Sequence, residues 1–250
     1  MLYVNNNGEI LENSDYSIKT GNRGYLYGDG VFESVRILNG KPINLANHIS
    51  RMLEGAKKIK MRPPSFFNVS FFEERILELC KKSGITEGGK CRISLDRSSG
   101  GTFKPDSNEV EFYIEVYPTE INKYELNQKG VELDIYIEHK KEKSSLSNFK
   151  TKNGLIYILA AISAKEKGLD DYLITNYTGG ILESTSSNLF VVSNGVLYTP
   201  GLEEGCLAGT MRMQVINLAL ANGIKVYECN ILPQNLLVAD EIFLTNAIKG

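Results

Sequence analysis

Hydrophobic and polar residues follow two different periods along this chain, and together the two periods predict alternating helices and strands. Residues 44–60 carry apolar side chains such as Leu45 and Ile49 at the spacing of one helix face. Residues 31–37 alternate between apolar and polar types, as a half-buried strand does, and an Asn-Gly turn follows them. The same patterns predict helices over residues 66–83, 153–168, 210–222 and 233–238, and strands over residues 91–96, 110–117, 130–138, 172–175, 188–193, 196–199, 225–229 and 241–245.

A polar stretch near the middle of the chain divides these elements into two groups. We predict one domain over residues 1–118, a linker over residues 119–125 and a second domain over residues 126–250. Helices and strands are interleaved in both groups, which favours antiparallel or mixed sheets. The fold class that follows is α+β.

Four glycines lie within residues 21–30, directly before the strand predicted over residues 31–37. Glycine permits a positive φ angle or the close approach of another backbone, so a long turn is the simplest interpretation. A dinucleotide-binding fingerprint is excluded, because that motif opens a helix and this run leads into a strand.

The charge balance mainly excludes certain classes of binding partner. The chain has 28 basic and 30 acidic side chains among 250 residues, a net charge of −2. Such a balance leaves no electrostatic footprint for nucleic acid or for an anionic membrane surface. No apolar run approaches the roughly 18 residues of a membrane span, and no basic region followed by an apolar core stands at the N-terminus. We therefore expect a soluble, cytoplasmic protein that binds neither nucleic acid nor membrane.

Cysteine and histidine are too sparse to suggest a metal site or a hydrolytic site. The four cysteines are widely spaced without a C-x-x-C pair, and we expect Cys80 and Cys206 to be buried thiols. The two histidines, His48 and His139, have no partner at metal-ligand spacing, and neither H-E-x-x-H nor G-x-S-x-G occurs. The sequence thus predicts no metal.

Two segments far apart in the chain carry the residues that suggest chemistry. Lys150 follows a charged segment and precedes an apolar helical run, a place where a solvated lysine is common. Glu183 is followed by a cluster of hydroxyl residues, by Asn188 and by an apolar strand, although a solvated carboxylate after a Gly-Gly turn is the plainer alternative. A lysine, a carboxylate and a loop of small residues are the groups that pyridoxal phosphate needs.

The loop over residues 205–209 is rich in small residues and leads directly into the helix predicted over residues 210–222. Free backbone N–H groups at the start of a helix favour an anion. When the loop is taken alone, an ordinary connection between a strand and a helix remains the simpler explanation.

Together these segments resemble the class IV aminotransferases that depend on pyridoxal phosphate, a family that includes branched-chain and D-amino-acid aminotransferases and 4-amino-4-deoxychorismate lyase. The family's signature of a glutamate, a small residue, an asparagine and a hydrophobic-aromatic pair is met by Glu183, Thr185, Asn188, Leu189 and Phe190. Further matches in the family's order are Arg23-Gly24, Tyr27 to Glu33, His48 with Arg51, Phe149 to Thr151, Leu197 to Thr199 and Leu207 to Arg212.

The resemblance implies a two-domain fold of type IV, with a small N-terminal α/β domain and a larger C-terminal domain that has a mixed, barrel-like sheet with helices. The cofactor, pyridoxal 5′-phosphate, would lie in a cleft between the two halves. Members of the family are usually dimers, so a homodimer is expected. The family's fold is also expected to continue past Gly250.

The resemblance also implies roles for individual residues. Lys150 would form a Schiff base with the cofactor and then move protons, because a desolvated lysine loses its own proton more readily. Glu183 would face the pyridine nitrogen, and Arg51 would bind the phosphate. The other positions that would touch the cofactor are Ser187, Gly209, Thr210, Met211 and Ala247, with Thr210 standing where the family usually has an aliphatic residue.

The substrate-binding positions depart from each branch of the family. Leu155 stands where branched-chain enzymes have a tyrosine, and Phe32 stands where D-amino-acid enzymes have one. Arg97 is the candidate for a substrate carboxylate, and a plain surface arginine is an equal alternative. Thr102 replaces the arginine that the lyases usually carry after a Gly-Gly pair.

Three functions remain open from the sequence. The leading interpretation is transfer of an amino group between an amino acid and a 2-oxo acid. The first alternative is release of pyruvate from 4-amino-4-deoxychorismate to give 4-aminobenzoate, with Lys150 as acid and base. The second alternative is a non-catalytic binding protein on the same fold.

Overall fold

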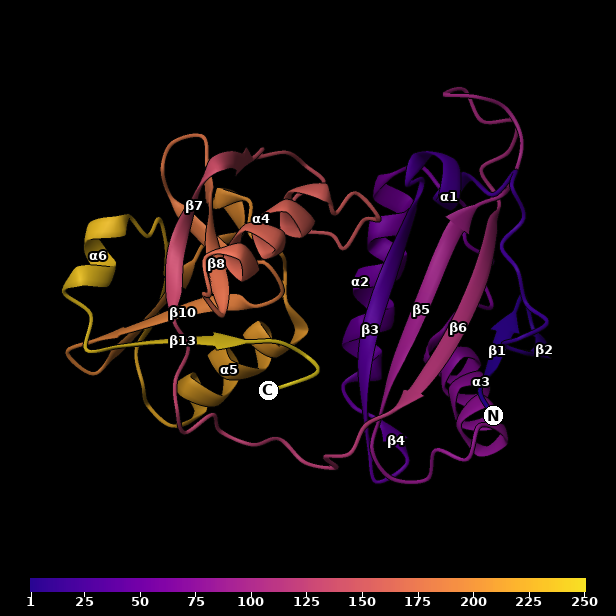
Figure 1. Ribbon diagram of the computed structural model, residues 1–250, viewed down its shortest axis with the longest axis horizontal. Helices are drawn as coiled ribbons and strands as arrows, with labels where there is room; N and C mark the ends of the chain where they lie inside the picture. Colours follow the sequence, from indigo (N-terminus) through magenta and orange to yellow (C-terminus); the bar gives the residue numbers. More distant parts are fainter. The chain divides into compact units, whose positions relative to one another are not determined.

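The computed structural model describes all 250 residues, which form two compact units. The first unit comprises Met1–Tyr124 and Phe149–Asn153, and the second comprises Glu125–Asn148 and Gly154–Gly250 (Figure 1). Both units combine helices with a sheet, which confirms the α+β fold class. The two units are close to equal in length, and the short segment that carries Lys150 belongs to the first.

The first unit is built on a six-stranded antiparallel sheet with the order β2-β1-β6-β5-β3-β4. Its strands are β1 (Tyr3–Asn6), β2 (Glu9–Glu12), β3 (Gly30–Leu38), β4 (Lys41–Pro42), β5 (Gly89–Arg97) and β6 (Val110–Pro118). Its helices are α1 (Arg23–Tyr27), α2 (Leu45–Lys58) and α3 (Val69–Lys82).

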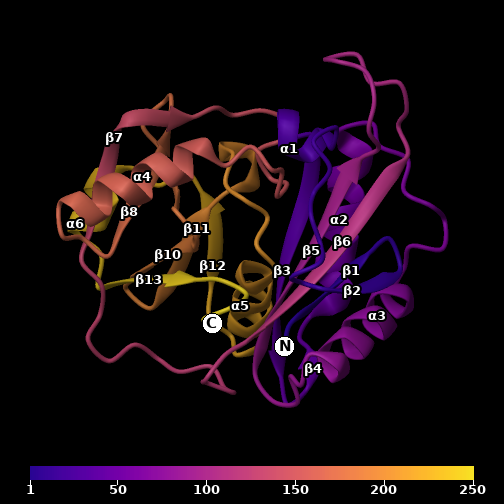
Figure 2. The same ribbon diagram turned by 45° about the vertical axis from the view of Figure 1, so that its right-hand side comes forward.

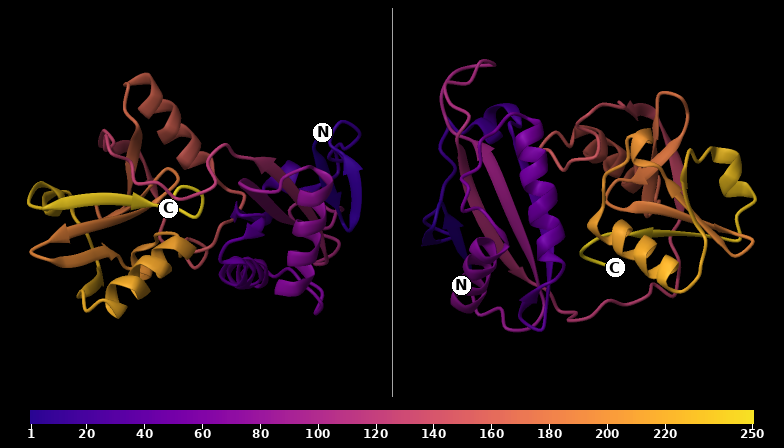
Figure 3. Two further views of the ribbon diagram at one scale, coloured as in Figure 1. Left: turned by 90° about the horizontal axis from the view of Figure 1, so that it is seen from below. Right: turned by 180° about the vertical axis from the view of Figure 1, so that it is seen from behind.

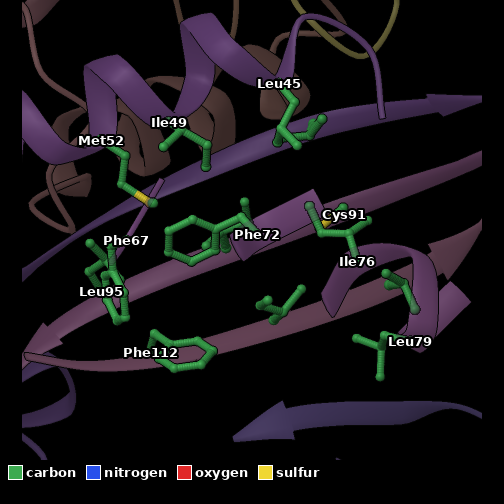
Figure 4. Packing of buried hydrophobic residues seen from close by; sticks show 14 of the residues in the cluster. Leu45, Ile49, Met52, Phe67, Phe72, Ile76, Leu79, Cys91, Leu95 and Phe112 are labelled. Carbon is green, nitrogen blue, oxygen red and sulfur yellow. The ribbon is translucent and has the colours of Figure 1, made fainter. Parts of the chain in front are cut away.

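Helices α2 and α3 cover one face of this sheet, as the view from behind in Figure 3 shows. In β3 the side chains of Val31 and Val35 are buried beneath the helices, whereas Phe32 lies on the opposite face, since successive strand residues alternate. Full burial of one such apolar side chain contributes about 1.5–3 kcal/mol to folding. Figure 4 shows the packed core, which includes Leu45, Ile49, Met52, Phe67, Phe72, Ile76, Leu79, Cys91, Leu95 and Phe112.

The glycine-rich segment before β3 is not the simple long turn predicted from the sequence, because it contains helix α1. The side chain of Asn22 accepts a hydrogen bond from the backbone N of Tyr25 at 2.7 Å, which caps the first turn. The helix stops at Gly28, whose φ of 63° is the left-handed conformation that favours glycine. The segment therefore presents a short, capped helix directly before β3.

The second unit contains a seven-stranded mixed sheet. Its path is β12-β11-β10-β9-β8-β7, and β13 pairs with β10 off this path. The strands are β7 (Leu133–Lys141), β8 (Asp171–Asn176), β9 (Ile181–Ser184), β10 (Asn188–Ser193), β11 (Val196–Pro200), β12 (Val226–Cys229) and β13 (Glu241–Thr245). The helices are α4 (Leu155–Glu166), the 3-10 helix η1 (Leu202–Glu204), α5 (Thr210–Ala221) and α6 (Pro233–Leu237).

This sheet is open, so the barrel-like closure expected from the resemblance is wrong: β7 and β12 are its two ends. The pairs β7–β8 and β11–β12 are parallel, and the other neighbours are antiparallel. Helix α4 packs on β7 and β8, and α5 packs on β12 (Figure 2). None of the helices combines the length and the apolar composition that crossing a membrane takes.

Candidate active site

Lys150 is held on the edge of the first unit's sheet. Its carbonyl accepts a hydrogen bond from the backbone N of Phe32 at 2.9 Å, and a bridge joins Thr151 to Val31. The ε-amine of Lys150 lies 4.6 Å from the centroid of the Phe32 ring. Helix α4 begins only at Leu155, so Lys150 belongs to a strand-like segment and not to a solvated helix start.

A second cation, Arg92 of β5, lies against the same ring and was missed from the sequence. Its guanidinium carbon is 3.9 Å from the centroid of the Phe32 ring. Burial lowers the pKa of Arg92 from its ordinary value, although Glu115 partly opposes the shift. The guanidinium of Arg92 donates no hydrogen bond within the chain. The alternation of polar Arg92 and Ser94 with apolar β5 neighbours was the signal that could have found this face.

Arg51 of α2 is paired with Glu33 of β3. The two carboxylate oxygens of Glu33 accept from Nε and Nη2 of Arg51 at 2.7 and 2.5 Å, and His48 Nδ1 lies 2.7 Å from one of them. Burial of Glu33 would raise its pKa, but the charge of Arg51 and the hydrogen bond with His48 outweigh burial and leave the pKa below its usual value. Glu33 is therefore an ionised, buried carboxylate that fixes the direction of the Arg51 guanidinium.

Arg97, at the end of β5, is buried in a network that joins distant segments. Its Nε donates to Asp29 at 2.8 Å, its Nη1 donates to Asn108 at 2.5 Å, and its Nη2 donates to the carbonyl of Ile59 at 2.6 Å. Arg23 donates to the same Asp29 oxygen at 2.9 Å. All three nitrogens of the Arg97 guanidinium are thus engaged in holding the fold.

Glu183 is the centre of a polar cluster in the second unit. Its side chain is 4% exposed, and its oxygen Oε1 accepts from Lys141 Nζ at 2.7 Å and from the Tyr157 hydroxyl at 2.8 Å. The other oxygen, Oε2, accepts from the backbone N of Leu207 at 2.8 Å. Burial and the neighbouring Glu183 raise the pKa of Tyr157, so this phenol stays protonated and donates. An ammonium, a phenol and an amide therefore all donate to this one carboxylate.

The loop that binds Glu183 leads directly into α5. Gly209 is the last residue before the helix, and a Cβ at this position would overlap the side-chain oxygen of Asn188. Asn188 in turn donates from Nδ2 to the carbonyl of Leu207 at 2.9 Å. No side chain caps the start of α5 at Gly209, and the free N–H groups of a first helical turn attract an anion.

Two further groups of the second unit lie next to this loop in the sheet register. Thr245 of β13 pairs with Asn188 of β10, and the Thr245 hydroxyl is buried without a hydrogen-bond partner. Ser187 accepts a hydrogen bond from Nδ2 of Asn246 at 2.9 Å. An orphaned hydroxyl in a buried position needs an acceptor or a donor from outside the chain.

These features of the second unit fit pyridoxal phosphate. A buried carboxylate with a lone pair left unused matches a pyridine N–H, and a helix start without a side-chain cap, with an orphaned hydroxyl beside it, matches a phosphate. The predicted residues are divided between the two units: Phe32, Arg51, Arg97 and Lys150 belong to the first, and Glu183, Ser187, Gly209, Thr210, Met211 and Ala247 belong to the second.

Comparison with known proteins gives consistent results. The model of the protein family described as amino-transferase class IV matches residues 30–250. D-alanine aminotransferase from Bacillus licheniformis is 27% identical over 240 residues, which cover 96% of this chain and 83% of that protein. Aminodeoxychorismate lyase from Bacillus subtilis is 28% identical over 259 aligned residues, which cover 99% of this chain and 83% of the lyase. The crystal structure of branched-chain aminotransferase from Thermoproteus uzoniensis with norvaline has a TM-score of 0.90 at 26% identity, and the match covers 99% of this chain and 84% of that one.

Proposed function

The chain belongs to the class IV amino-transferase family, and from this premise we propose that it transfers an amino group between an amino acid and a 2-oxo acid with pyridoxal 5′-phosphate as cofactor. Its relatives are aminotransferases and aminodeoxychorismate lyases, so the chain is an enzyme of this family. The three relatives described above have different activities at almost equal identity. The choice among activities therefore depends on the residues of the site.

The observation that carries the proposal is the placement of Glu183 beside the loop that starts α5. Glu183 is buried and accepts from Lys141, Tyr157 and the Leu207 amide. Removing a carboxylate and an ammonium from water costs free energy, so a buried pair of this kind is weak evidence for stability alone and suggests a functional role. The second oxygen of Glu183 receives a single hydrogen bond, from the amide of Leu207, so a further lone pair remains to accept from a pyridine N–H. The same loop carries the anion-binding helix start, which suits the other end of the cofactor.

The chain's own residues would then divide the work. Lys150 would attach the cofactor covalently through its ε-amine, and the same amine, once released, would move the proton from Cα of the amino acid to the former aldehyde carbon of the cofactor. Glu183 would keep the pyridine nitrogen protonated, and the start of α5 with Thr245 would hold the phosphate. Arg51, oriented by Glu33, would add a positive charge for the phosphate. Bound pyridoxal phosphate supplies the conjugated ring that takes up the electrons of the broken bond.

For the substrate carboxylate we propose Arg92 in place of Arg97. Arg97 has no donor left for a substrate, because its three nitrogens are bound to protein groups. The guanidinium of Arg92 makes no hydrogen bond within the chain, and it lies against the same Phe32 ring as Lys150. An amino acid bound there would meet a guanidinium for its carboxylate within reach of the lysine that moves its proton.

A half-reaction distinguishes transfer from elimination. The purified protein with bound cofactor is mixed with single L- and D-amino acids and with no 2-oxo acid. We expect at least one amino acid to convert the cofactor to pyridoxamine phosphate and to release one equivalent of its 2-oxo acid per site. The opposite outcome is that no amino acid converts the cofactor while 4-amino-4-deoxychorismate yields pyruvate; this result would assign the lyase activity of the Bacillus subtilis relative.

The homodimer implied by the resemblance and the cytoplasmic location expected from the sequence stay predictions. Light scattering coupled to size-exclusion chromatography measures the mass of the assembly and tests the first of them. A protein that binds no cofactor and converts no substrate in the half-reaction would instead support the non-catalytic alternative.

A further inference from the structure

We propose that the ion pair between Asp96 and Lys152, the Asp96–Lys152 clamp, positions the segment that carries Lys150. The inference rests on the proposed role of Lys150. Lys152 lies two positions after Lys150 in the sequence, and Asp96 lies 54 positions before it. Neither Asp96 nor Lys152 is among the residues proposed to bind the cofactor, so their role is positioning.

The clamp is buried on its acidic side. Lys152 Nζ pairs with Oδ1 of Asp96, and the two side chains are 17% and 1% exposed. Apart from the ammonium of Lys152, no group of the chain contacts this oxygen as a donor, so Lys152 alone compensates its charge. A buried carboxylate that loses its counter-charge destabilises the state in which it is buried.

Asp96 itself is a rigid anchor. Its other oxygen accepts from Nδ2 of Asn22, the residue that caps α1, at 3.1 Å. Gly24 and Gly30 leave room for the carboxylate, because a Cβ on either glycine would overlap it. Asp96 also lies opposite Gly30 in the register of β3 and β5. The position of the carboxylate is therefore set by α1, β3 and β5 independently of Lys152.

The position of Lys152 against β3 also fixes which face of β3 the side chain of Lys150 lies on. Gly30 and Phe32 are two positions apart on β3 and therefore face the same side of the sheet, so the two lysine side chains that lie against them share one face. Along β3, Lys150 lies over Phe32, and the side chain of Lys152 passes Gly30, two positions earlier. A slip of one residue would turn Lys150 to the opposite face, and the ion pair opposes such a slip.

The main chain alone holds the segment weakly. Only two backbone hydrogen bonds join it to β3: Phe32 N donates to Lys150 O at 2.9 Å, and Lys152 N donates to Gly30 O at 3.0 Å. Short edge pairings of this kind open readily unless side chains secure them. The clamp supplies that security at the position next to the second hydrogen bond.

Hydrogen exchange of the cofactor-free protein tests the clamp without using activity. Lys152→Met removes the charge and keeps the length of the side chain, and Asp96→Asn removes the charge of its partner. We expect the amides of residues 32 and 152 to exchange about tenfold faster in each variant, relative to amides between β3 and β5. The double variant should add little, because each single change already breaks the pair. Lys81→Met, which removes an exposed lysine of α3, is the matched control and should change neither amide.

A second measurement tests whether the clamp affects the reaction of Lys150 with the cofactor. The rate at which Lys150 captures added pyridoxal phosphate, trapped by borohydride and measured on the Lys150 peptide, should fall about tenfold in Lys152→Met and not in Lys81→Met. Exchange rates of both amides within twofold of the unaltered protein in both clamp variants would overturn the clamp. If the unaltered protein captures no cofactor on Lys150, the proposed function fails, while the exchange measurement still decides the clamp.

Discussion

Replacing Glu33 by glutamine is predicted to destabilise the first unit strongly. The Glu33 side chain is fully buried and receives three short contacts, two from Arg51 at 2.7 and 2.5 Å and one from His48 at 2.7 Å. Glutamine has one acceptor oxygen, so its amide nitrogen would face a donor of Arg51 or His48. Breaking a buried ion pair from one side costs about 3–5 kcal/mol, a large part of the roughly 5–15 kcal/mol that keeps a domain folded.

Urea denaturation followed by circular dichroism measures this loss at pH 7. Glu54→Gln is the matched control, because Glu54 lies on α2 in an exposed position and bonds only to Ser50; its loss should stay within about 0.5 kcal/mol. The double variant Glu33→Leu with Arg51→Met removes both charges and should recover most of the loss. If Glu33→Gln were no more destabilising than Glu54→Gln, the assignment of an ionised Glu33 that stabilises the fold through its pair with Arg51 would be refuted.

The same variant carries a pH signature. Because the pKa of Glu33 is lowered in the folded state, its contribution is fully present above the unfolded value of about 4.3 and is lost as the pH falls through the folded value. Above about pH 5 the Glu33 carboxylate is ionised in both states, so its own titration leaves the difference in unfolding free energy between the unaltered protein and Glu33→Gln unchanged there. This difference should shrink as the pH is lowered below about 4. A difference in unfolding free energy that grows as the pH is lowered below about 4 would contradict the lowered pKa of Glu33.

Three further substitutions test the site. Tyr157→Phe removes one hydrogen bond to a buried carboxylate and should cost about 1.5–3 kcal/mol in urea denaturation, and no measurable change would contradict that bond. Gly209→Ala places a Cβ on the side-chain oxygen of Asn188, so we expect about 1–3 kcal/mol of destabilisation and weaker pyridoxal phosphate binding in equilibrium dialysis; unchanged binding would argue against this loop as the phosphate site. Arg92→Met should raise KM for the amino acid by about 10- to 100-fold, and an unchanged KM would return the carboxylate role to another residue.

Periodicity in the sequence predicted the long helices of both units, because each of them shows a continuous apolar face or run. Helix α1 was missed, since its five residues are too few for a period and its cap depends on the single side chain of Asn22. Strand β9 was missed as well: all four of its residues are buried, so no alternation marks it. Short elements of this kind form because their neighbours bury them, and a local pattern does not show those neighbours.

The candidate site shows the same limit in its side chains. The signature residues around Glu183 are recognisable in sequence, but Lys141, its ion-pair partner, looked like part of an ordinary charged segment. Arg92 and Arg97 stand on one strand, and the alternation that marks the face of Arg92 does not show which of the two side chains has hydrogen-bond partners. Asp29 and the carbonyl of Ile59 bind the side chain of Arg97, whereas the side chain of Arg92 makes no hydrogen bond. Long-range contacts therefore determine which guanidinium keeps its donors unused.

The central claim is that Lys150 carries the cofactor, and borohydride reduction followed by peptide mass analysis measures it directly. The protein is incubated with pyridoxal 5′-phosphate, reduced, digested and searched for a phosphopyridoxyl group on every lysine. The account predicts one modified residue, Lys150, and loss of the modification in Lys150→Ala while circular dichroism shows the fold intact. A stoichiometric modification of another lysine, or one that persists in Lys150→Ala, would contradict it.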